Sequence, residues 1–389
     1  MVSGTKASEG VDFELDQLPA LIHAAMPNVT VEVTKLPDDQ YYTSLTTKLA
    51  SGEAPDMFLV QPRTAGTNGV ATLAKAGYLA DLSDLTFWDN MPASGVSDMS
   101  YNKLIYGIPQ GVAFLGAYYN KDIFAKYNLA VPTTWAEFTT ACETLKSNGV
   151  TPIVSGDKDS YVIQFPLYQM AANEIYSKNA AFDSQLAKKE TSFTDGAWDN
   201  ILTMYTDLYA KGYVNKNSLG YSASQAIQMF IDGQAAIIVD GSWDYAAVTA
   251  TGAAKFERGF LTLPSTSGDN YVSASTGAGY GVYAKSANVD TCKAILNLMC
   301  DGKSDLFKAW AANPRIISTY AGQEIANPLF KDAMASYSAG KAFYFCNQAW
   351  PAGVETEMEA KLSEIIGGES TTVKDVTAAM QAKYDELTA

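Results

Sequence analysis

The stretch from Tyr101 to Phe138, YNKLIYGIPQGVAFLGAYYNKDIFAKYNLAVPTTWAEF, constrains the fold more than any other part of the chain. Gly107 and Pro109 interrupt the backbone, and the run GVAFLGAYYN that follows is apolar and aromatic, which is typical of a buried strand. NKDIFAKYN then begins a helical turn. A break, a buried strand and a helix-rich region in this order predict a crossing from one region of the protein into another.

The helix that comes next has clear boundaries in the sequence. Pro132 stops the preceding segment, and Thr134-x-x-Glu137 has the spacing of a capping box. The predicted apolar face carries Trp135, Phe138, Cys142 and Leu145, and the helix is expected to end at Gly149.

Length and charge limit the classes of protein to consider. A chain of 389 residues exceeds one ordinary hydrophobic core, so two domains are expected. The formal charge of -15 disfavours nucleic acid and anionic membranes as partners. No run approaches the ~18 apolar residues of a membrane span. The opening MVSGTKASEG has no apolar core, so neither a signal peptide nor a lipid-attachment segment is predicted in this chain.

The cysteines and the histidine do not suggest a metal site. Cys142, Cys292, Cys300 and Cys346 form no CxxC pair, and His23 is the only histidine. Four buried thiols, a solvated histidine and no bound metal or cofactor are therefore predicted.

The first part of the chain alternates helix and strand. A helix is predicted from Val11 to Ala25, and the alternation of Val29, Val31 and Val33 then predicts a half-buried strand. Asp38 or Asp39 can cap a second helix, which has a stripe of Tyr41, Leu45 and Leu49 and ends at Gly52. A short buried strand to Val60 follows, and this order favours a parallel α/β organisation.

The later segments continue the same pattern. TPIV predicts a strand, and residues 198–211 have the full apolar stripe of a packed helix. AIQMFIDGQAAIIVDGSW predicts a helix, a glycine turn, a strand and a loop that bears Trp243. TGAGYGVYAKSAN predicts a second aromatic strand rather than a phosphate loop, because no P-loop lysine or dinucleotide fingerprint follows it. A helix near residues 290–300 comes next, and residues 328–387 are predicted to be mostly helical.

Several motifs together resemble a known family. Gly-x-Pro at 107–109, aromatic-Tyr-Asn-Lys-Asp-x-Phe at 118–124, Pro-x-Thr-Trp-x-Glu-Phe at 132–138 and Gly-Ser-Trp at 241–243 are similar to those of family 1 extracellular solute-binding proteins, the sugar-capturing components of ABC importers. The resemblance implies an α/β, two-lobe, periplasmic-binding-protein-like fold with hinge-connected lobes and a ligand cleft. The N-terminal lobe would comprise residues 1–112 and 271–319, and the C-terminal lobe residues 113–270 and a helical part, 320–389.

The sequence departs from the family at its start. Family members begin with an apolar strand, whereas this chain begins with the polar MVSGTKASEG. The opening strand is therefore predicted to be missing. An unfilled sheet position would favour association of an otherwise monomeric protein.

The resemblance implies a binding function rather than catalysis. The protein is expected to capture a neutral sugar or oligosaccharide by hinge closure and to deliver it to an ABC importer permease. It would do so outside the cytoplasm, in the periplasm or lipid-anchored at the cell surface. Two alternatives remain: an engineered binding scaffold or sensor part derived from such a protein, and a carbohydrate-active enzyme. An enzyme would need paired carboxylates, and no nucleophile elbow, metal cluster or phosphate loop stands out.

Candidate ligand-binding residues follow from the rule that open α/β sheets bind ligands beyond the carboxyl ends of their strands. They are Gln61, Arg63, Gln110, Phe114, Tyr161, Asp240, Trp243, Tyr280 and Arg315, with Tyr41 and Trp350 as further candidates. Trp243 is placed at the centre, beneath the sugar ring, with Asp240 and Gln110 at the hydroxyls. For each aromatic the alternative is inter-lobe or core packing, and for the two arginines it is a surface cation or a lobe-to-lobe salt bridge.

Overall fold

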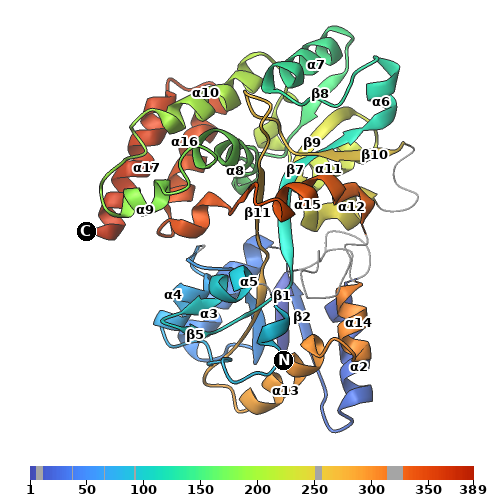
Figure 1. The fold of residues 1–389 in the computed structure, drawn as a ribbon, viewed down its shortest axis with the longest axis vertical. Coiled ribbons are helices and arrows are strands. Elements are labelled where there is room, and N and C mark those ends of the chain that lie inside the picture. The colour runs from blue at the N-terminus through green and yellow to red at the C-terminus, as the bar shows by residue number, and fades with distance from the viewer. Residues whose placement is uncertain (6–11, 37, 65, 92, 250–255, 313–326) are drawn as a thin grey trace. The chain divides into compact units, whose positions relative to one another are not determined.

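The computed structural model describes residues 1–5, 12–36, 38–64, 66–91, 93–249, 256–312 and 327–389. The chain divides into two compact units, Met1–Ala113 with Thr276–Ile325 and Phe114–Ser275 with Ala326–Ala389, which Figure 1 shows as ribbons. The sequence placed the changes of lobe near Val112, Tyr271 and Thr319. The described changes of unit lie between residues 113 and 114 and between residues 275 and 276.

The sheet of the first unit has five strands in the order β2-β1-β3-β12-β6. Its strands are β1 (Val2–Thr5), β2 (Val33–Leu36), β3 (Met57–Val60), β6 (Ile108–Pro109) and β12 (Gly279–Val282). β1 pairs in parallel with both β2 and β3, whereas β12 is antiparallel to β3 and β6. The α/β organisation predicted from the sequence is confirmed. Strand β12, which comes late in the sequence, lies between β3 and β6.

The prediction of a missing opening strand is wrong. β1 begins at the second residue and lies between β2 and β3, inside the sheet. A central strand is held mainly by backbone hydrogen bonds to both neighbours, so it does not require an apolar run. Val2 and Ser3 are buried, and the missing side chain of Gly4 leaves room for the Lys35 side chain. Strand β1 is therefore formed mainly by small residues, whereas the prediction required an apolar run.

The helices of the first unit differ in part from the prediction. They are α1 (Phe13–Asp16), α2 (Leu18–Ala25), α3 (Asp38–Ser51), α4 (Val70–Lys75), η1 (Trp88–Asn90), α5 (Ala93–Asp98), α13 (Val289–Cys300) and α14 (Asp305–Ala311), and a two-stranded ribbon joins β4 (Ser100–Tyr101) to β5 (Leu104–Ile105). The single N-terminal helix is in fact two helices, because Pro19 has no N–H and starts α2 in its first turn. The strand expected from Val29 begins only at Val33. The buried stripe of α3, Tyr41, Leu45 and Leu49, is confirmed.

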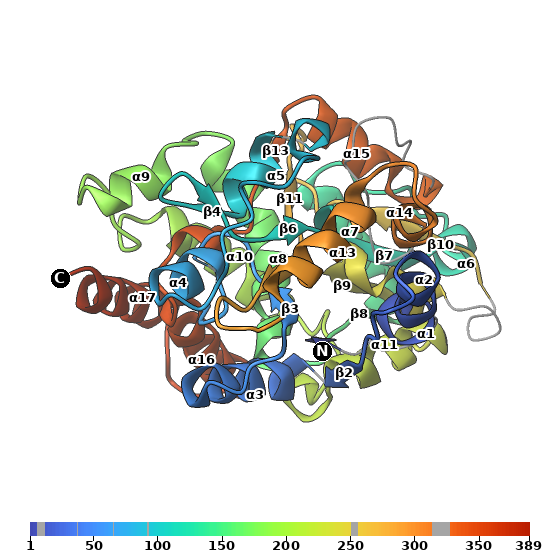
Figure 2. The same ribbon diagram turned by 90° about the horizontal axis from the view of Figure 1, so that it is seen from below.

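Both faces of the first sheet are covered by side chains. Met57 belongs to a core cluster with residues of α2, α13 and α14, and its neighbour Phe58 belongs to a second cluster with residues of α3 and α4. Successive strand residues point to opposite faces, so the two clusters lie on opposite sides of β3. Figures 1 and 2 both show α2 beside α14.

The sheet of the second unit has the order β13-β11-β7-β9-β8, with β10 also paired to β7. The strands are β7 (Val112–Asn120), β8 (Thr151–Val154), β9 (Ala235–Gly241), β10 (Arg258–Leu261), β11 (Val272–Thr276) and β13 (Ala342–Phe343). β7 is the buried strand predicted from GVAFLGAYYN, and it is antiparallel to β9 with Leu115 opposite Gly241. β8 is parallel to β9, so these two strands end at the same edge.

Helices surround this second sheet. They are α6 (Lys121–Lys126), α7 (Trp135–Ser147), η2 (Ser160–Val162), α8 (Gln164–Ala171), the π-helix η3 (Ala172–Tyr176), α9 (Phe182–Ala187), α10 (Ala197–Ala210), η4 (Ser218–Gly220), α11 (Ala223–Ile231), η5 (Ser242–Asp244), α12 (Tyr245–Thr249), η6 (Pro328–Phe330), α15 (Lys331–Ser338), η7 (Cys346–Ala349), α16 (Val354–Ile366) and α17 (Val373–Thr388). The predicted capping box is confirmed: the Glu137 N–H donates to Thr134 Oγ1 at 3.2 Å, and the Thr134 N–H donates to the Glu137 carboxylate at 3.2 Å.

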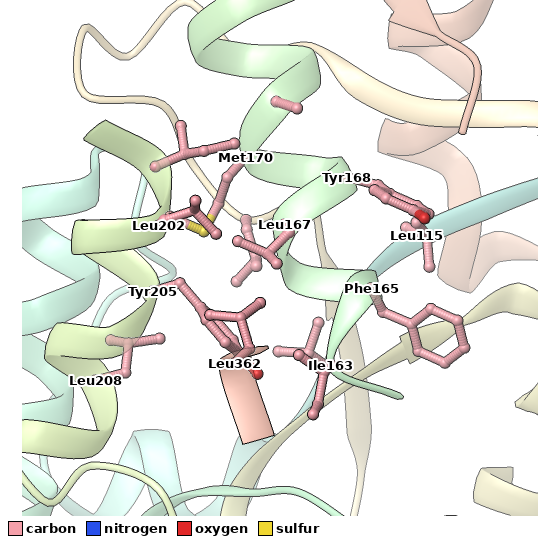
Figure 3. Packing of buried hydrophobic residues seen from close by; sticks show 14 of the residues in the cluster. Leu115, Ile163, Phe165, Leu167, Tyr168, Met170, Leu202, Tyr205, Leu208 and Leu362 are labelled. Carbon is pink, nitrogen blue, oxygen red and sulfur yellow. The ribbon is translucent and has the colours of Figure 1, made fainter. Parts of the chain in front are cut away.

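The core of the second unit lies between α8, α10 and α16. Figure 3 shows Leu202, Tyr205 and Leu208 of α10 together with Leu167 of α8 and Leu362 of α16. α10, α16 and α17 lie side by side (Figure 1). All four cysteines of the chain are buried and His23 is exposed, as predicted.

Candidate functional site

The candidate site lies at the edge of the second unit where the parallel strands β8 and β9 end. Open α/β sheets bind ligands beyond these carboxyl ends, because the loops there meet at one edge. The loop after β8 leads into η2 and Tyr161, and β9 leads directly into η5 and Trp243.

Four aromatic rings follow one another at this edge. Ring centroids are 5.8 Å apart for Tyr161 and Phe165, 5.2 Å for Phe165 and Trp243, and 6.1 Å for Trp243 and Phe345. We call these four residues the aromatic row. Tyr161 is 36% exposed, Trp243 and Phe345 are half-buried, and Phe165 lies on the side of α8 away from α10 (Figure 3). The row thus offers accessible ring surface at Tyr161, Trp243 and Phe345.

The turn that carries Trp243 is held by three hydrogen bonds. The Gly241 N–H donates to Asp240 Oδ1 at 2.7 Å, the Tyr118 hydroxyl donates to the Gly241 carbonyl at 3.0 Å, and the Phe114 N–H donates to Ser242 Oγ at 3.1 Å. A Cβ on Gly241 would lie only 2.2 Å from Cη2 of the Trp243 indole. The indole therefore folds back over Gly241, and only glycine leaves room for it there.

Asp240 lies beneath this turn rather than on its surface. The residue is 5% exposed, and burial, together with the nearby Asp244 carboxyl, raises its pKa well above the ordinary range. A buried carboxyl with a raised pKa offers no charge to a ligand. Asp240 therefore supports the turn, and its contact with sugar hydroxyls stays a prediction.

A second network holds the loop that leads to Tyr161. The Ser155 N–H donates to Asn215 Oδ1 at 2.7 Å, and the Tyr209 hydroxyl donates to Asp157 at 3.0 Å. The Ser160 hydroxyl, next to Tyr161, donates to Glu359 at 2.7 Å. Burial raises the pKa of Glu359 to about 7. Tyr161 thus projects from a loop that side chains tie to the core.

In the first unit, a set of hydrogen-bonded polar residues lies around the end of β3. Arg63 takes a left-handed backbone conformation, φ 55°, and its Nε donates to Asp98 at 2.7 Å. The other Asp98 oxygen accepts from the Thr276 hydroxyl at 2.6 Å. Gln61 Nε2 donates to the Tyr42 hydroxyl, and the Gln110 N–H donates to the Ala278 carbonyl at 3.1 Å. Arg63 therefore forms an ion pair within the first unit, which is not the lobe-to-lobe salt bridge that the sequence left as an alternative, and it keeps 38% of its side chain exposed.

Four predicted aromatics lie in the cores instead of on a surface. Tyr41 and Tyr280 are 1% exposed, and Phe114 and Trp350 are 0% exposed. The Tyr41 hydroxyl donates to the Leu59 carbonyl at 2.9 Å, and Tyr280 donates to Glu14. Phe114 packs against Tyr337 with centroids 6.0 Å apart, and Trp350 Nε1 donates to Asp183 at 3.2 Å. Their burial favours the packing alternative, because no ring face is left for a ligand.

Two members of the aromatic row were not predicted. Phe165 lies four positions after Tyr161, and Phe345 lies in the aromatic segment before Trp350. Both are therefore close in sequence to predicted site residues. Spacing alone could not separate them from core residues. Arg315, the remaining candidate, lies outside the described residues.

The described residues contain neither a metal-site cluster nor a membrane-spanning helix. No cluster of histidine, cysteine, aspartate and glutamate there has the composition of a metal site. No described helix combines the length and apolar character needed to span a bilayer.

The fold matches solved structures along the whole chain. A chitin oligosaccharide binding protein superposes with a TM-score of 0.83 at 24% identity, covering 100% of this chain and 99% of its own. RafE in complex with raffinose superposes with a TM-score of 0.82 at 18% identity, covering 100% of both chains. The fold is therefore the two-lobe α/β fold of solute-binding proteins.

The family is established by sequence. The family described as bacterial extracellular solute-binding protein matches residues 14–300, so the chain belongs to that family. A relative named multiple sugar-binding protein, from Streptococcus mutans serotype c, is 25% identical over 255 residues, which cover 64% of this chain and 59% of the relative. The chain thus spans less than two thirds of that relative's length. The relatives named here are binding proteins, and the family is extracellular.

Proposed function

We propose that this protein captures a neutral sugar or oligosaccharide outside the cytoplasm and delivers it to the permease of an ABC importer. The aromatic row is the observation that carries the proposal. The names of the relatives, which bind multiple sugars, chitin oligosaccharide and raffinose, support the same class of ligand.

The chemistry of the row suits a sugar ring. Sugars present hydroxyls around the edge and C–H groups on the faces, so a site needs a flat apolar surface with polar groups at its rim. Tyr161 and Trp243 supply ring faces that lose little conformational entropy on binding. Tyr161, Trp243 and Phe345 offer ring surface at three positions, which favours an oligosaccharide over a single sugar unit.

The charges near the row favour a neutral ligand over a phosphorylated one. The titratable side chains that hold the Tyr161 loop are acidic, Asp157, Asp159 and Glu359. Of the arginines considered, Arg63 directs its Nε to Asp98. An anionic sugar would therefore meet mainly acidic side chains at this edge.

The proposal includes the movement and setting expected of the family. The two units would close on the sugar around β7 and β11, where the chain passes from one unit to the other, and the protein would act as a monomer. It would be held in the periplasm or at the cell surface. Small-angle scattering with and without sugar tests the closure, and an unchanged radius of gyration at saturation would contradict it.

The binding experiment uses calorimetry and thermal shift with raffinose and chitin oligosaccharides. Trp243→Ala should weaken binding by about 1–3 kcal/mol, which is the loss of one half-buried aromatic contact. Trp135→Ala is the matched control, because Trp135 is also half-buried in the second unit but stacks on Phe138 with centroids 5.2 Å apart. Equal affinity of wild type and Trp243→Ala would contradict the site, and consumption of the sugar would indicate an enzyme instead.

A further inference from the structure

Strand β7 reaches the turn that carries Trp243 through two hydrogen bonds that lie outside the backbone pairing of β7 with β9. The Tyr118 hydroxyl donates to the Gly241 carbonyl at 3.0 Å. The Phe114 N–H donates to Ser242 Oγ at 3.1 Å. Resting on the sugar-binding function proposed above, we propose that Tyr118 and Ser242 are positioning residues, which set the orientation in which the Trp243 indole meets a sugar.

Ser242 lies at the point where β9 changes into the helical turn η5. The last backbone pair between β7 and β9 is Leu115 with Gly241, so the next pair in the same register would be Phe114 with Ser242. At this position the Ser242 hydroxyl oxygen, and not the Ser242 carbonyl, accepts the Phe114 N–H. The Ser242 carbonyl accepts the Tyr245 N–H instead, which closes η5. Ser242 therefore satisfies the strand and the turn together, and the chain leaves the sheet directly before the indole.

The two donor residues on β7 are themselves fixed by packing, and both are 0% exposed. The Tyr118 ring packs edge-on against Phe260 with centroids 5.0 Å apart, and the Phe114 ring packs against Tyr337 with centroids 6.0 Å apart. Phe330 contacts both rings, with centroid distances of 6.3 Å to Tyr118 and 6.5 Å to Phe114. A donor that is already ordered loses little entropy when it holds its acceptor. The peptide group before the indole is therefore held on both sides by rigid partners.

The orientation of the indole depends on this peptide group. A Cβ on Gly241 would lie 2.2 Å from the Trp243 ring, so the ring lies over the glycine. Only Ser242 separates the two residues, and a rotation of the planar peptide between Gly241 and Ser242 would carry the indole away from its place. Trp243 lies between Phe165 and Phe345 in the aromatic row, with centroids 5.2 Å and 6.1 Å from theirs. A displaced indole would therefore interrupt the row that a sugar would meet.

Removing either hydrogen bond should lower the fraction of molecules in which the indole is in place. Ser242→Ala leaves the buried Phe114 N–H without its acceptor unless the turn rearranges, and Tyr118→Phe keeps the packed ring but removes one hydrogen bond. The loss of one such bond shifts an equilibrium by roughly two- to tenfold. Because apparent affinity is proportional to the binding-competent fraction, each variant should bind raffinose about two- to tenfold more weakly than wild type.

The primary test needs no sugar, because the Trp243 indole lies over Gly241. The ring current of an indole displaces the NMR signals of protons that lie beneath its face. The Gly241 Hα signals should therefore be displaced in wild type and return toward ordinary values in Trp243→Ala. Ser242→Ala and Tyr118→Phe should move these signals in the same direction as Trp243→Ala. A loss of global stability alone would leave them in place in the folded protein.

Two matched variants control for the loss of a buried hydroxyl. Ser273→Ala, on β11 of the same unit, removes a buried hydroxyl that has no hydrogen-bond partner among the described residues. Tyr119→Phe alters the next residue of β7, whose side chain points to the opposite face of the sheet and packs on Phe124 with centroids 4.8 Å apart. Both variants should keep the Gly241 signals and the raffinose affinity of wild type.

The NMR and calorimetric readouts separate the positioning role from the sugar-binding function. Wild-type Gly241 signals in both Ser242→Ala and Tyr118→Phe would overturn the positioning role. Displaced signals with unchanged raffinose affinity would overturn the link between indole orientation and binding. If the signals move but wild type binds neither raffinose nor chitin oligosaccharides, the sugar-binding function fails while the positioning role stands. Where Ser242→Ala does not fold, Tyr118→Phe supplies the same comparison.

Discussion

Replacing Gly241 by alanine should displace the Trp243 indole without touching any other ring of the aromatic row. The added Cβ would lie 2.2 Å from indole Cη2 and 2.3 Å from Cζ2 and Cζ3. Ordinary contact begins at about 3.4 Å, so the ring has to move by roughly 1 Å or more. Overpacking of this kind typically costs about 1–3 kcal/mol of folding free energy.

The origin of this cost can be measured by a double-mutant cycle. In the Trp243→Ala background the clashing ring is absent, so Gly241→Ala should cost little. The coupling free energy between the two positions should be at least about 1 kcal/mol, well above the additive range of distant sites. Urea unfolding of wild type, both single variants and the double variant gives the four free energies.

A matched glycine controls for backbone effects. A Cβ on Gly220, in η4 of the same unit, would meet nothing within 4 Å. Gly220→Ala should therefore leave stability unchanged or raise it by about 0.4–1 kcal/mol through the unfolded chain. Additive costs for Gly241→Ala and Trp243→Ala would refute the argument that the indole lies over the glycine.

Two further predictions concern stability. Thr134→Ala removes the cap of α7 and should lower the free energy of unfolding by about 1 kcal/mol. Thr140→Ala, on the exposed side of the same helix, should not lower it. Equal melting temperatures for Thr134→Ala and wild type would contradict the capping role. Burial raises the pKa of Glu359 to about 7, so the folded protein retains a proton there that the unfolded chain releases near the ordinary value of 4.5. The contribution of Glu359 to stability is thus present at low pH and is lost as pH rises toward about 7. Glu359→Gln should flatten the pH dependence of urea unfolding between these values. Glu357→Gln, two positions earlier on α16, should not flatten it. A wild-type profile for Glu359→Gln would show that the Glu359 carboxyl is ionised in the folded protein.

The sequence predicted the elements that local chemistry determines. The capping box at Thr134, the stripe of α3 and the long strand β7 are each specified by residue types at fixed spacing, and each is confirmed. The departures involve structure fixed by distant partners. β1 is a strand because β2 and β3 lie on either side of it, and nothing in Val-Ser-Gly-Thr shows this.

The candidate site could be predicted only where position along a strand implies position on the surface. Trp243 and Tyr161 follow strands β9 and β8, and both belong to the aromatic row. Phe114 and Tyr280 lie within or beside strands too, but their neighbours in space bury them completely. Burial depends on which segments pack together, and a residue's own sequence neighbourhood does not contain that information.

The position of β12 in the first sheet sets the order in which the chain can fold. Tyr280 pairs with Leu59, about 220 residues earlier, and β12 separates β3 from β6. During synthesis the edge of β3 that β12 will occupy is complete as soon as Val60 has emerged, yet its partner is made only after the whole of residues 114–275. Pairings of such large sequence separation form slowly. An emerging chain therefore carries an open, apolar strand edge for most of its synthesis, and unpaired edges of this kind recruit other chains. Secretion machinery or a chaperone that keeps the first unit unfolded until β12 is available would remove that hazard.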